Sequence, residues 1–152
     1  SLKNFSKALL VTAIFVLSPI SSFAGEIGIV NNARLYELSP EAQKAQKEIL
    51  DERESLQKRF AELSAELESA LKDTNLSEAD KLQKRKSAQE EFELEKKRLD
   101  DIIQTRRESI EKSILKAIQS EASSQGLDMV VSSNVVFYGG KDITEKVLTR
   151  LK

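Results

Sequence analysis

Apolar residues recur at the a and d spacing of a coiled coil in the first long segment that lacks glycine. The only proline of this segment, Pro40, stands at its start, and Ser39 before it is a preferred N-cap residue. We therefore expect a helix from Pro40 to about Lys72. Its apolar edge comprises Ile49, Leu56, Phe60, Leu63, Leu67 and Ala70.

A second long helix is expected after a turn at residues 73–75. Ser77, followed three residues later by Asp80, is typical of a capping box, and no glycine or proline intervenes before Gly126, a common helix terminator. About 45 helical residues would extend on the order of 65 Å. The short turn between the two helices predicts an antiparallel hairpin.

The facing edge of the second helix is less apolar than that of the first. A cation on this edge must either reach solvent along its aliphatic stem or lose its hydration. We therefore expect a hairpin that is pliant toward its tip and firm at its base, where Ile110, Ile114, Leu115 and Ile118 form an apolar stripe. The expected seam positions are Leu82, Arg85, Gln89, Phe92, Lys96, Leu99, Ile103, Arg106 and Ile110.

Short β-branched runs at both ends of the chain predict a small sheet. Residues 26–31 are expected to form one strand, and residues 127–132 and 135–140 to form two strands around a tight turn. A final helix is expected to open at Asp142 with a capping sequence. The residues of this helix that share an apolar face are Ile143, Val147, Leu148 and Leu151.

These terminal segments are too small to fold alone. The 14 residues of segment 25–38 and the 27 of segment 126–152 give a body of 41 residues, and its strands have open edges. The expected fold is α+β: a helical arm of residues 39–125 on a β-rich body shared between identical subunits. The residues expected to form this oligomerisation body are Ile27, Ile29, Leu127, Met129, Val131, Val135 and Phe137.

Residues 1–24 differ in character from the rest of the chain. Lys3 and Lys7 precede an apolar run of 10 residues, and Ser22 and Ala24 are small residues at the positions that a signal peptidase reads. This pattern predicts a signal peptide cleaved near Ala24 and a periplasmic mature chain. A buried or interfacial helix is the alternative. Cleavage would leave 22 basic and 25 acidic residues, a net charge of −3.

Composition excludes several classes of function. The chain has no Cys and no His, so it lacks thiolate and imidazole chemistry, and zinc and haem ligation are ruled out with them. The serine-rich stretches have no histidine to activate them, and the carboxylates are spaced as on solvated helices. We therefore expect no enzyme, no cofactor, no metal and, given the near-zero net charge, no nucleic-acid partner.

The arm surface allows two interpretations. Apolar residues off the seam are ordinary in a structural coiled coil, but on a pliant arm they would offer scattered apolar patches to an unfolded client. Basic residues near the tip slightly outnumber the acidic ones, which favours an anionic lipid or chain as partner; a solvated helix face explains them equally well. These tip cations are Lys72, Lys81, Lys84, Arg85 and Lys86.

Three stretches resemble the Skp/OmpH family of periplasmic chaperones: residues 27–31 (IGIVN), 127–131 (LDMVV) and 141–148 (KDITEKVL). The resemblance implies a homotrimer with a small β-barrel body and three helical arms around a cavity, which holds unfolded outer-membrane proteins without ATP. The best-known member is strongly basic, unlike this chain. The basic pair proposed there to bind lipopolysaccharide falls near Asp101-Ile102, so that site is not carried over, and lipopolysaccharide remains only an open alternative beside anionic lipid as a partner.

The favoured hypothesis is a trimeric holdase chaperone, and the alternative is a structural spacer or an adaptor for a folded periplasmic partner. The residues expected to contact clients are Phe60, Leu67, Leu71, Phe92, Leu94 and Ile102.

Overall fold

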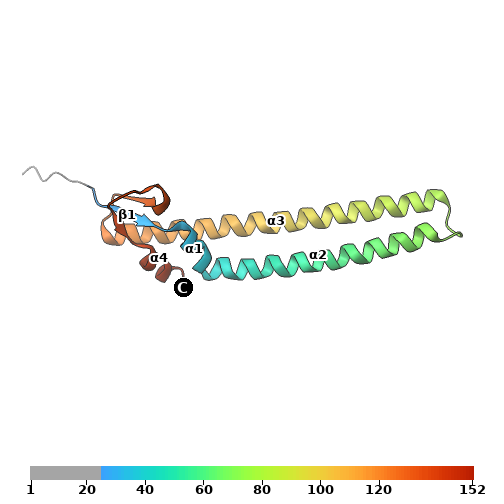
Figure 1. Ribbon diagram of the computed structural model, residues 1–152, viewed down its shortest axis with the longest axis horizontal. Helices are drawn as coiled ribbons and strands as arrows, with labels where there is room; N and C mark the ends of the chain where they lie inside the picture. Colours follow the sequence, from blue (N-terminus) through green and yellow to red (C-terminus); the bar gives the residue numbers. More distant parts are fainter. Residues whose placement is uncertain (1–24) are drawn as a thin grey trace, which may run out of the picture.

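Two long antiparallel helices project from a small body of strands and short helices (Figure 1). The structure is a computed structural model that describes residues 25–152, and the predicted signal peptide lies outside the described residues. The hairpin consists of α2 (Pro40–Lys72) and α3 (Glu78–Gln125). The body contains β1 (Ile27–Val30), α1 (Asn32–Leu38), β2 (Met129–Ser132), the 3₁₀ turn η1 (Ser133–Val135), β3 (Lys141–Asp142) and α4 (Thr144–Arg150).

The predicted ends of both long helices are confirmed. The Ser39 hydroxyl accepts a hydrogen bond from the Ala42 amide at the start of α2, and the Ser77 hydroxyl accepts one from the Asp80 amide at the start of α3. α3 stops at Gly126, whose φ of +66° lies in the left-handed region that glycine adopts without strain.

The expected seam is only partly correct. Leu63, Leu99 and Ile110 are buried, whereas Leu82, which we placed on the seam, is 64 % exposed. The other expected α3 seam positions that prove to be exposed are Arg85, Gln89 and Lys96. From the base to Phe92 every expected seam residue of α3 except Lys96 is at least half-buried, whereas the register fails toward the tip, where α3 has few large apolar residues.

The sheet has the order β2–β1–β3, with both pairs parallel. Ile27 pairs with Met129, and Gly28 and Ile29 pair with Lys141 and Asp142. The expected strand at residues 135–140 is wrong, because residues 133–135 form a 3₁₀ turn and the third strand begins only at Lys141. A β-branched run needs a partner edge to become a strand, and within one protomer residues 135–140 pair with none.

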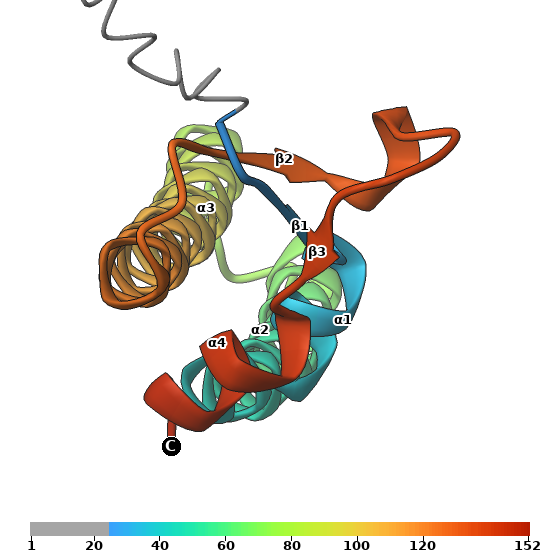
Figure 2. The same cartoon turned by 90° about the vertical axis from the view of Figure 1, so that its left-hand side faces the viewer.

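The core lies where the body meets the base of the hairpin. Figure 2 shows α1 and α4 below the strands and α3 beside them. Leu35, Ile143 and Val147 are at most 1 % exposed. The other buried residues of this cluster are Val30, Ala45, Ile110, Ile114, Ala117 and Leu148. The base of the arm is therefore part of the body core, which has more apolar material than the terminal segments alone supply.

The residues predicted to form the oligomerisation body lie outside this core. Alternate residues of a strand point to opposite faces, and Gly28 and Val30 face the helices. The opposite side, the open sheet face, carries Ile27, Ile29, Met129 and Val131. Of the other three predicted residues, Leu127 is partly buried against the core, and Val135 and Phe137 are 67 % and 107 % exposed.

Candidate functional site

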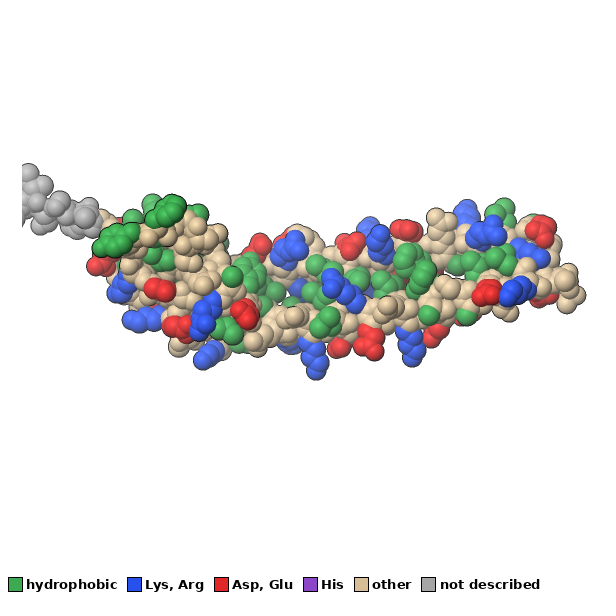
Figure 3. All heavy atoms as spheres, viewed as in Figure 1, with side chains coloured by type: hydrophobic (Ala, Val, Ile, Leu, Met, Phe, Trp, Pro, Cys, Tyr) green, Lys and Arg blue, Asp and Glu red, His purple; other side chains and the backbone are tan. Residues whose placement is uncertain are grey.

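The six side chains predicted to contact clients are spread along the arm and do not form one site. Phe60 and Leu94 are exposed by 49 % and 67 %. The remaining four are half-buried: Leu67, Leu71, Phe92 and Ile102. Figure 3 shows apolar side chains in separate patches between charged ones along the hairpin. An arm of this kind offers many small apolar contacts.

Two of these residues come together across the hairpin. The rings of Phe60 on α2 and Phe92 on α3 have centroids 4.7 Å apart at an interplanar angle of 47°, within the range of favourable aromatic pairs. They border a shallow hollow, and Phe60 remains half-exposed at its edge. Its lining residues are Phe60, Leu63, Ser64, Leu67, Arg85, Ala88, Gln89 and Phe92.

Leu94 and Ile102 lie together on α3 along a second groove, nearer the body. Arg98 and Asp101 line the same groove, so its apolar surface is framed by charges. The structure thus brings the predicted contact residues into two groups, one across the hairpin with Phe60, Leu67 and Phe92 and one on α3 with Leu94 and Ile102. Leu71 lies with neither group.

Ion pairs between the two helices fix their register. Arg59 donates to Glu91 at 2.7 Å, and Arg98 donates to Glu52 at 2.7 Å. The hydrogen bond from Arg59 lowers the pKa of Glu91. Arg106, a cation at an expected seam position, pairs with Glu48, and this bond lowers the pKa of the Glu48 carboxyl. These ion pairs were not predicted from the sequence, although an arginine at a seam position indicates that a carboxylate faces it.

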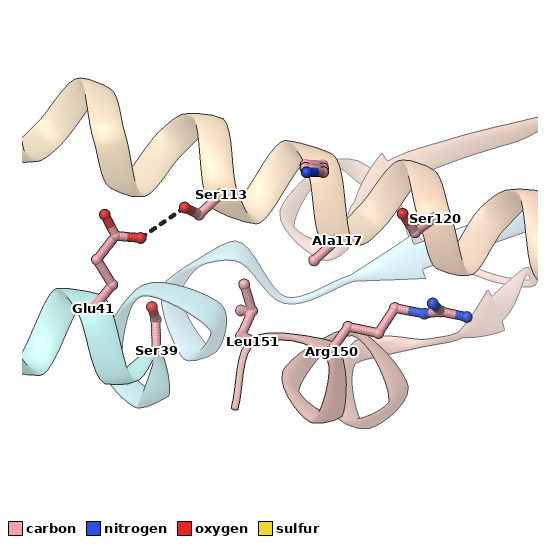
Figure 4. A pocket seen from close by; sticks show the side chains of 8 residues that line it. Ser39, Glu41, Ser113, Ala117, Ser120, Arg150 and Leu151 are labelled. Carbon is pink, nitrogen blue, oxygen red and sulfur yellow. Dashed lines mark hydrogen bonds between the residues drawn. The ribbon is translucent and has the colours of Figure 1, made fainter.

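At the base of the hairpin, one carboxylate accepts two hydroxyl hydrogen bonds. Ser109 and Ser113 on α3 donate to Glu41 on α2 at 2.5 and 2.6 Å, and these bonds lower the pKa of Glu41. Figure 4 shows Glu41, Ser113, Ser120 and Arg150 around the hollow beside this contact.

A second carboxylate joins α3 to the final helix. Arg150 on α4 donates to Glu121 at 2.5 Å, and Gln125 donates to the other oxygen of the same carboxylate at 2.6 Å. The hydrogen bonds from Gln125 and Arg150 lower the pKa of Glu121, which is buried. Both carboxylates are held ionised by their partners, a role that positions helices and does not suit acid–base catalysis.

The predicted basic tip is largely paired within its own helices. Lys72, Lys81 and Lys86 each lie next to a glutamate of the same helix, at 2.6, 3.4 and 3.9 Å. Lys84 and Arg85 form no ion pair within residues 25–152. The free positive charge of the tip is therefore concentrated on these two neighbouring residues.

The body carries the largest exposed apolar side chains. Phe137 and Tyr138 are 107 % and 99 % exposed, and the space-filling view shows apolar atoms over this end of the molecule (Figure 3). Gly140 lies against Ile29, where a Cβ would come within 2.5 Å of the side chain. Tyr138 lies within the predicted body of residues 126–152 but was not among the seven residues named for the contact between subunits, although it belongs to the same apolar run 135–138 as Val135 and Phe137.

A family model described as outer membrane protein (OmpH-like) matches residues 26–151. The chain belongs to the OmpH-like family. The match spans the sheet, the hairpin and α4, and it confirms the resemblance drawn from the three short stretches. No curated protein matches the chain.

Members of the OmpH-like family are non-enzymatic periplasmic chaperones that bind unfolded outer-membrane proteins. The family assignment therefore favours chaperone-type function, in agreement with a surface built for contact. None of the helices in residues 25–152 has both the length and the apolar character needed to cross a bilayer.

Proposed function

We propose that this chain is an ATP-independent periplasmic holdase that binds unfolded outer-membrane β-barrel proteins and prevents their aggregation in transit to the outer membrane. The observation that carries this proposal is the set of separate apolar patches that the hairpin leaves uncovered along its length. Of the side chains predicted to contact clients, Phe60 and Leu94 are the exposed ones. An unfolded β-barrel protein exposes apolar side chains and unpaired strands, which such a surface can cover.

The acting form in this proposal is a homotrimer. The open sheet face, with Ile27, Ile29, Met129 and Val131, and the exposed Phe137 of the same body supply apolar surface for contacts between subunits. The number three comes from the family resemblance. Three tethered arms would sum many weak contacts into useful affinity without a nucleotide cycle.

In the same proposal, residues 1–24 direct export and are removed near Ala24. Periplasmic localisation places the mature chain on the path of outer-membrane proteins, and the family assignment supports this compartment.

A dilution assay tests the holdase activity. A urea-unfolded outer-membrane β-barrel protein is diluted into buffer with and without the mature chain, in the absence of nucleotide, and light scattering is followed. We expect suppression at a stoichiometric ratio, and weaker suppression by the double variant Phe60→Ser/Leu94→Ser. Gln57→Ser/Gln119→Ser, which alters exposed polar residues of the same helices, is the matched control and should suppress fully.

The competing functions give different outcomes. A structural spacer would leave the scattering unchanged. An adaptor for a folded partner would bind the folded barrel in detergent in preference to the unfolded chain. Either result would overturn the holdase proposal.

A further inference from the structure

The two sides of the hairpin differ at the level of the aromatic pair. One side holds the hollow bordered by Phe60 and Phe92, here called the Phe60 face. The opposite hollow shares the floor residues Leu63, Leu67 and Ala88 but has different walls. Glu66, Glu91 and Lys84 line the opposite hollow, whereas no carboxylate lines the Phe60 face.

The charge of the Phe60 face comes from Arg85. Arg59 binds Glu91 and Glu66, which line the opposite hollow, and Lys81 and Lys86 bind glutamates of their own helix. Within residues 25–152, the Arg85 guanidinium has no ion-pair partner. The face therefore combines an apolar floor with one uncompensated positive charge at its rim.

The size of the hollow fits a single side chain. Its volume is about 240 Å³, below the roughly 300–1,000 Å³ of small-molecule sites. An aromatic side chain placed there would contact the half-exposed Phe60 ring and Leu67, and a carboxylate next to it in sequence could reach Arg85. Aromatic contacts and rim ion pairs of this kind are individually weak and additive along an extended chain.

We propose that the Phe60 face recognises an extended segment of an unfolded polypeptide in which an aromatic residue neighbours an acidic one. This inference rests on the proposed holdase function and specifies which client segments the arm prefers. Charge complementarity indicates this segment. Because the Phe60 face has one unpaired arginine and no carboxylate, it favours an acidic residue beside the bound aromatic residue over a basic one.

Tryptophan-containing peptides provide the test, because the protein itself has no Trp and the emission reports the peptide alone. Two short acetylated and amidated peptides differ only in a central Trp-Asp or Trp-Lys pair, and a Ser-Asp peptide serves as competitor. They are titrated with the full mature chain at low salt. We expect Trp-Asp to bind about two- to fivefold more tightly than Trp-Lys, and Ser-Asp to compete poorly.

Charge reversals at two adjacent residues distinguish recognition at the Phe60 face from a general effect of net charge on peptide binding. Arg85→Glu should invert the preference between Trp-Asp and Trp-Lys. Lys84→Glu makes the same change in charge, but Lys84 lines the opposite hollow. The ratio of the affinities for Trp-Asp and Trp-Lys should therefore stay as in the wild type. Phe60→Ser should weaken both Trp peptides about two- to tenfold.

Three results would overturn the inference: no preference between the peptides in the wild type, equal effects of Arg85→Glu and Lys84→Glu on the ratio, or a change in oligomer mass for Phe60→Ser. The last result would identify the face as a contact between copies of the chain. Aggregation suppression is measured on the same samples. Suppression without peptide preference overturns this inference alone, whereas loss of suppression by the wild type overturns the proposed function.

Discussion

Arg106 and Glu48 face each other across the hairpin, and the guanidinium donates two hydrogen bonds, of 2.7 and 2.9 Å, to the carboxylate. A bidentate pair fixes the register of α2 against α3 at a seam position that carries no apolar residue. Arg106→Ala should therefore lower the melting temperature, and a double-mutant cycle with Glu48→Gln should give a coupling that shrinks at high salt. A coupling that is zero at low salt would contradict this role.

Acidic pH should destabilise the protein. The folded-state pKa of Glu41 is lowered by the Ser109 and Ser113 hydroxyls, and that of Glu121 by Gln125 and Arg150. Below the pKa of the unfolded chain, about 4.3, the unfolded state binds more protons than the folded state. The stability that the Glu41 and Glu121 carboxylates contribute is therefore fully present above this pH. It is lost as the pH falls through their lower folded-state pKa values.

Melting temperatures measured from about pH 6 to about pH 3 check this dependence. Glu121→Gln should lower the melting temperature near neutral pH, because a charge-assisted bond to Arg150 is lost, and should flatten the acid decline. Glu54→Gln, at an exposed carboxyl that makes no hydrogen bond within residues 25–152, is the matched control. An identical decline in wild type and Glu121→Gln would exclude Glu121 as a contributor.

The core at the base of the arm depends on Leu35. This side chain is fully buried between the body and the hairpin, so Leu35→Ala should lower the free energy of unfolding by about 2–5 kcal/mol. Leu50→Ala, at a leucine that is 55 % exposed, should change it by less than about 0.5 kcal/mol. Urea unfolding at one fixed protein concentration compares them, and equal midpoints would refute the core assignment.

The open sheet face should hold the subunits together. Ile29→Asp places a charge at its centre and should reduce the mass measured by light scattering to that of a smaller species. Leu94→Asp introduces the same charge on the arm and should keep the wild-type mass. Unchanged mass for Ile29→Asp, with a circular dichroism spectrum like that of the wild type, would remove Ile29 from the interface.

Charge reversal at the tip should weaken the capture of unfolded clients. Lys84→Glu, Arg85→Glu and Lys86→Glu together replace three cations with anions, so affinity for an acidic unfolded barrel protein should fall at low salt and converge with the wild type at high salt. Binding is measured by fluorescence of the labelled client. A loss independent of salt, or no loss, would show that tip charge does not steer clients.

Local signals in the sequence determined the two long helices of this protein. Ser39, Ser77 and Gly126 fixed the helix ends because capping is an interaction between a residue and its own neighbouring backbone, which needs no tertiary partner. The heptad pattern likewise identified Leu63, Leu99 and Ile110 as buried, because a helix face follows from spacing alone.

Tertiary structure decided what depends on a distant partner. Residues 135–138 have a strand-like sequence but pair with no strand of the described residues 25–152, whereas Lys141–Asp142, with no β-branched run, pairs with β1 because the chain returns there. Leu82 fits the seam by spacing yet is exposed, while Glu48 and Arg106 meet only once the hairpin register is set. Strand pairing and ion pairs across the hairpin join residues far apart in sequence. Local spacing therefore identifies residues that can form a strand or an ion pair, and only the folded chain decides which partner each one meets.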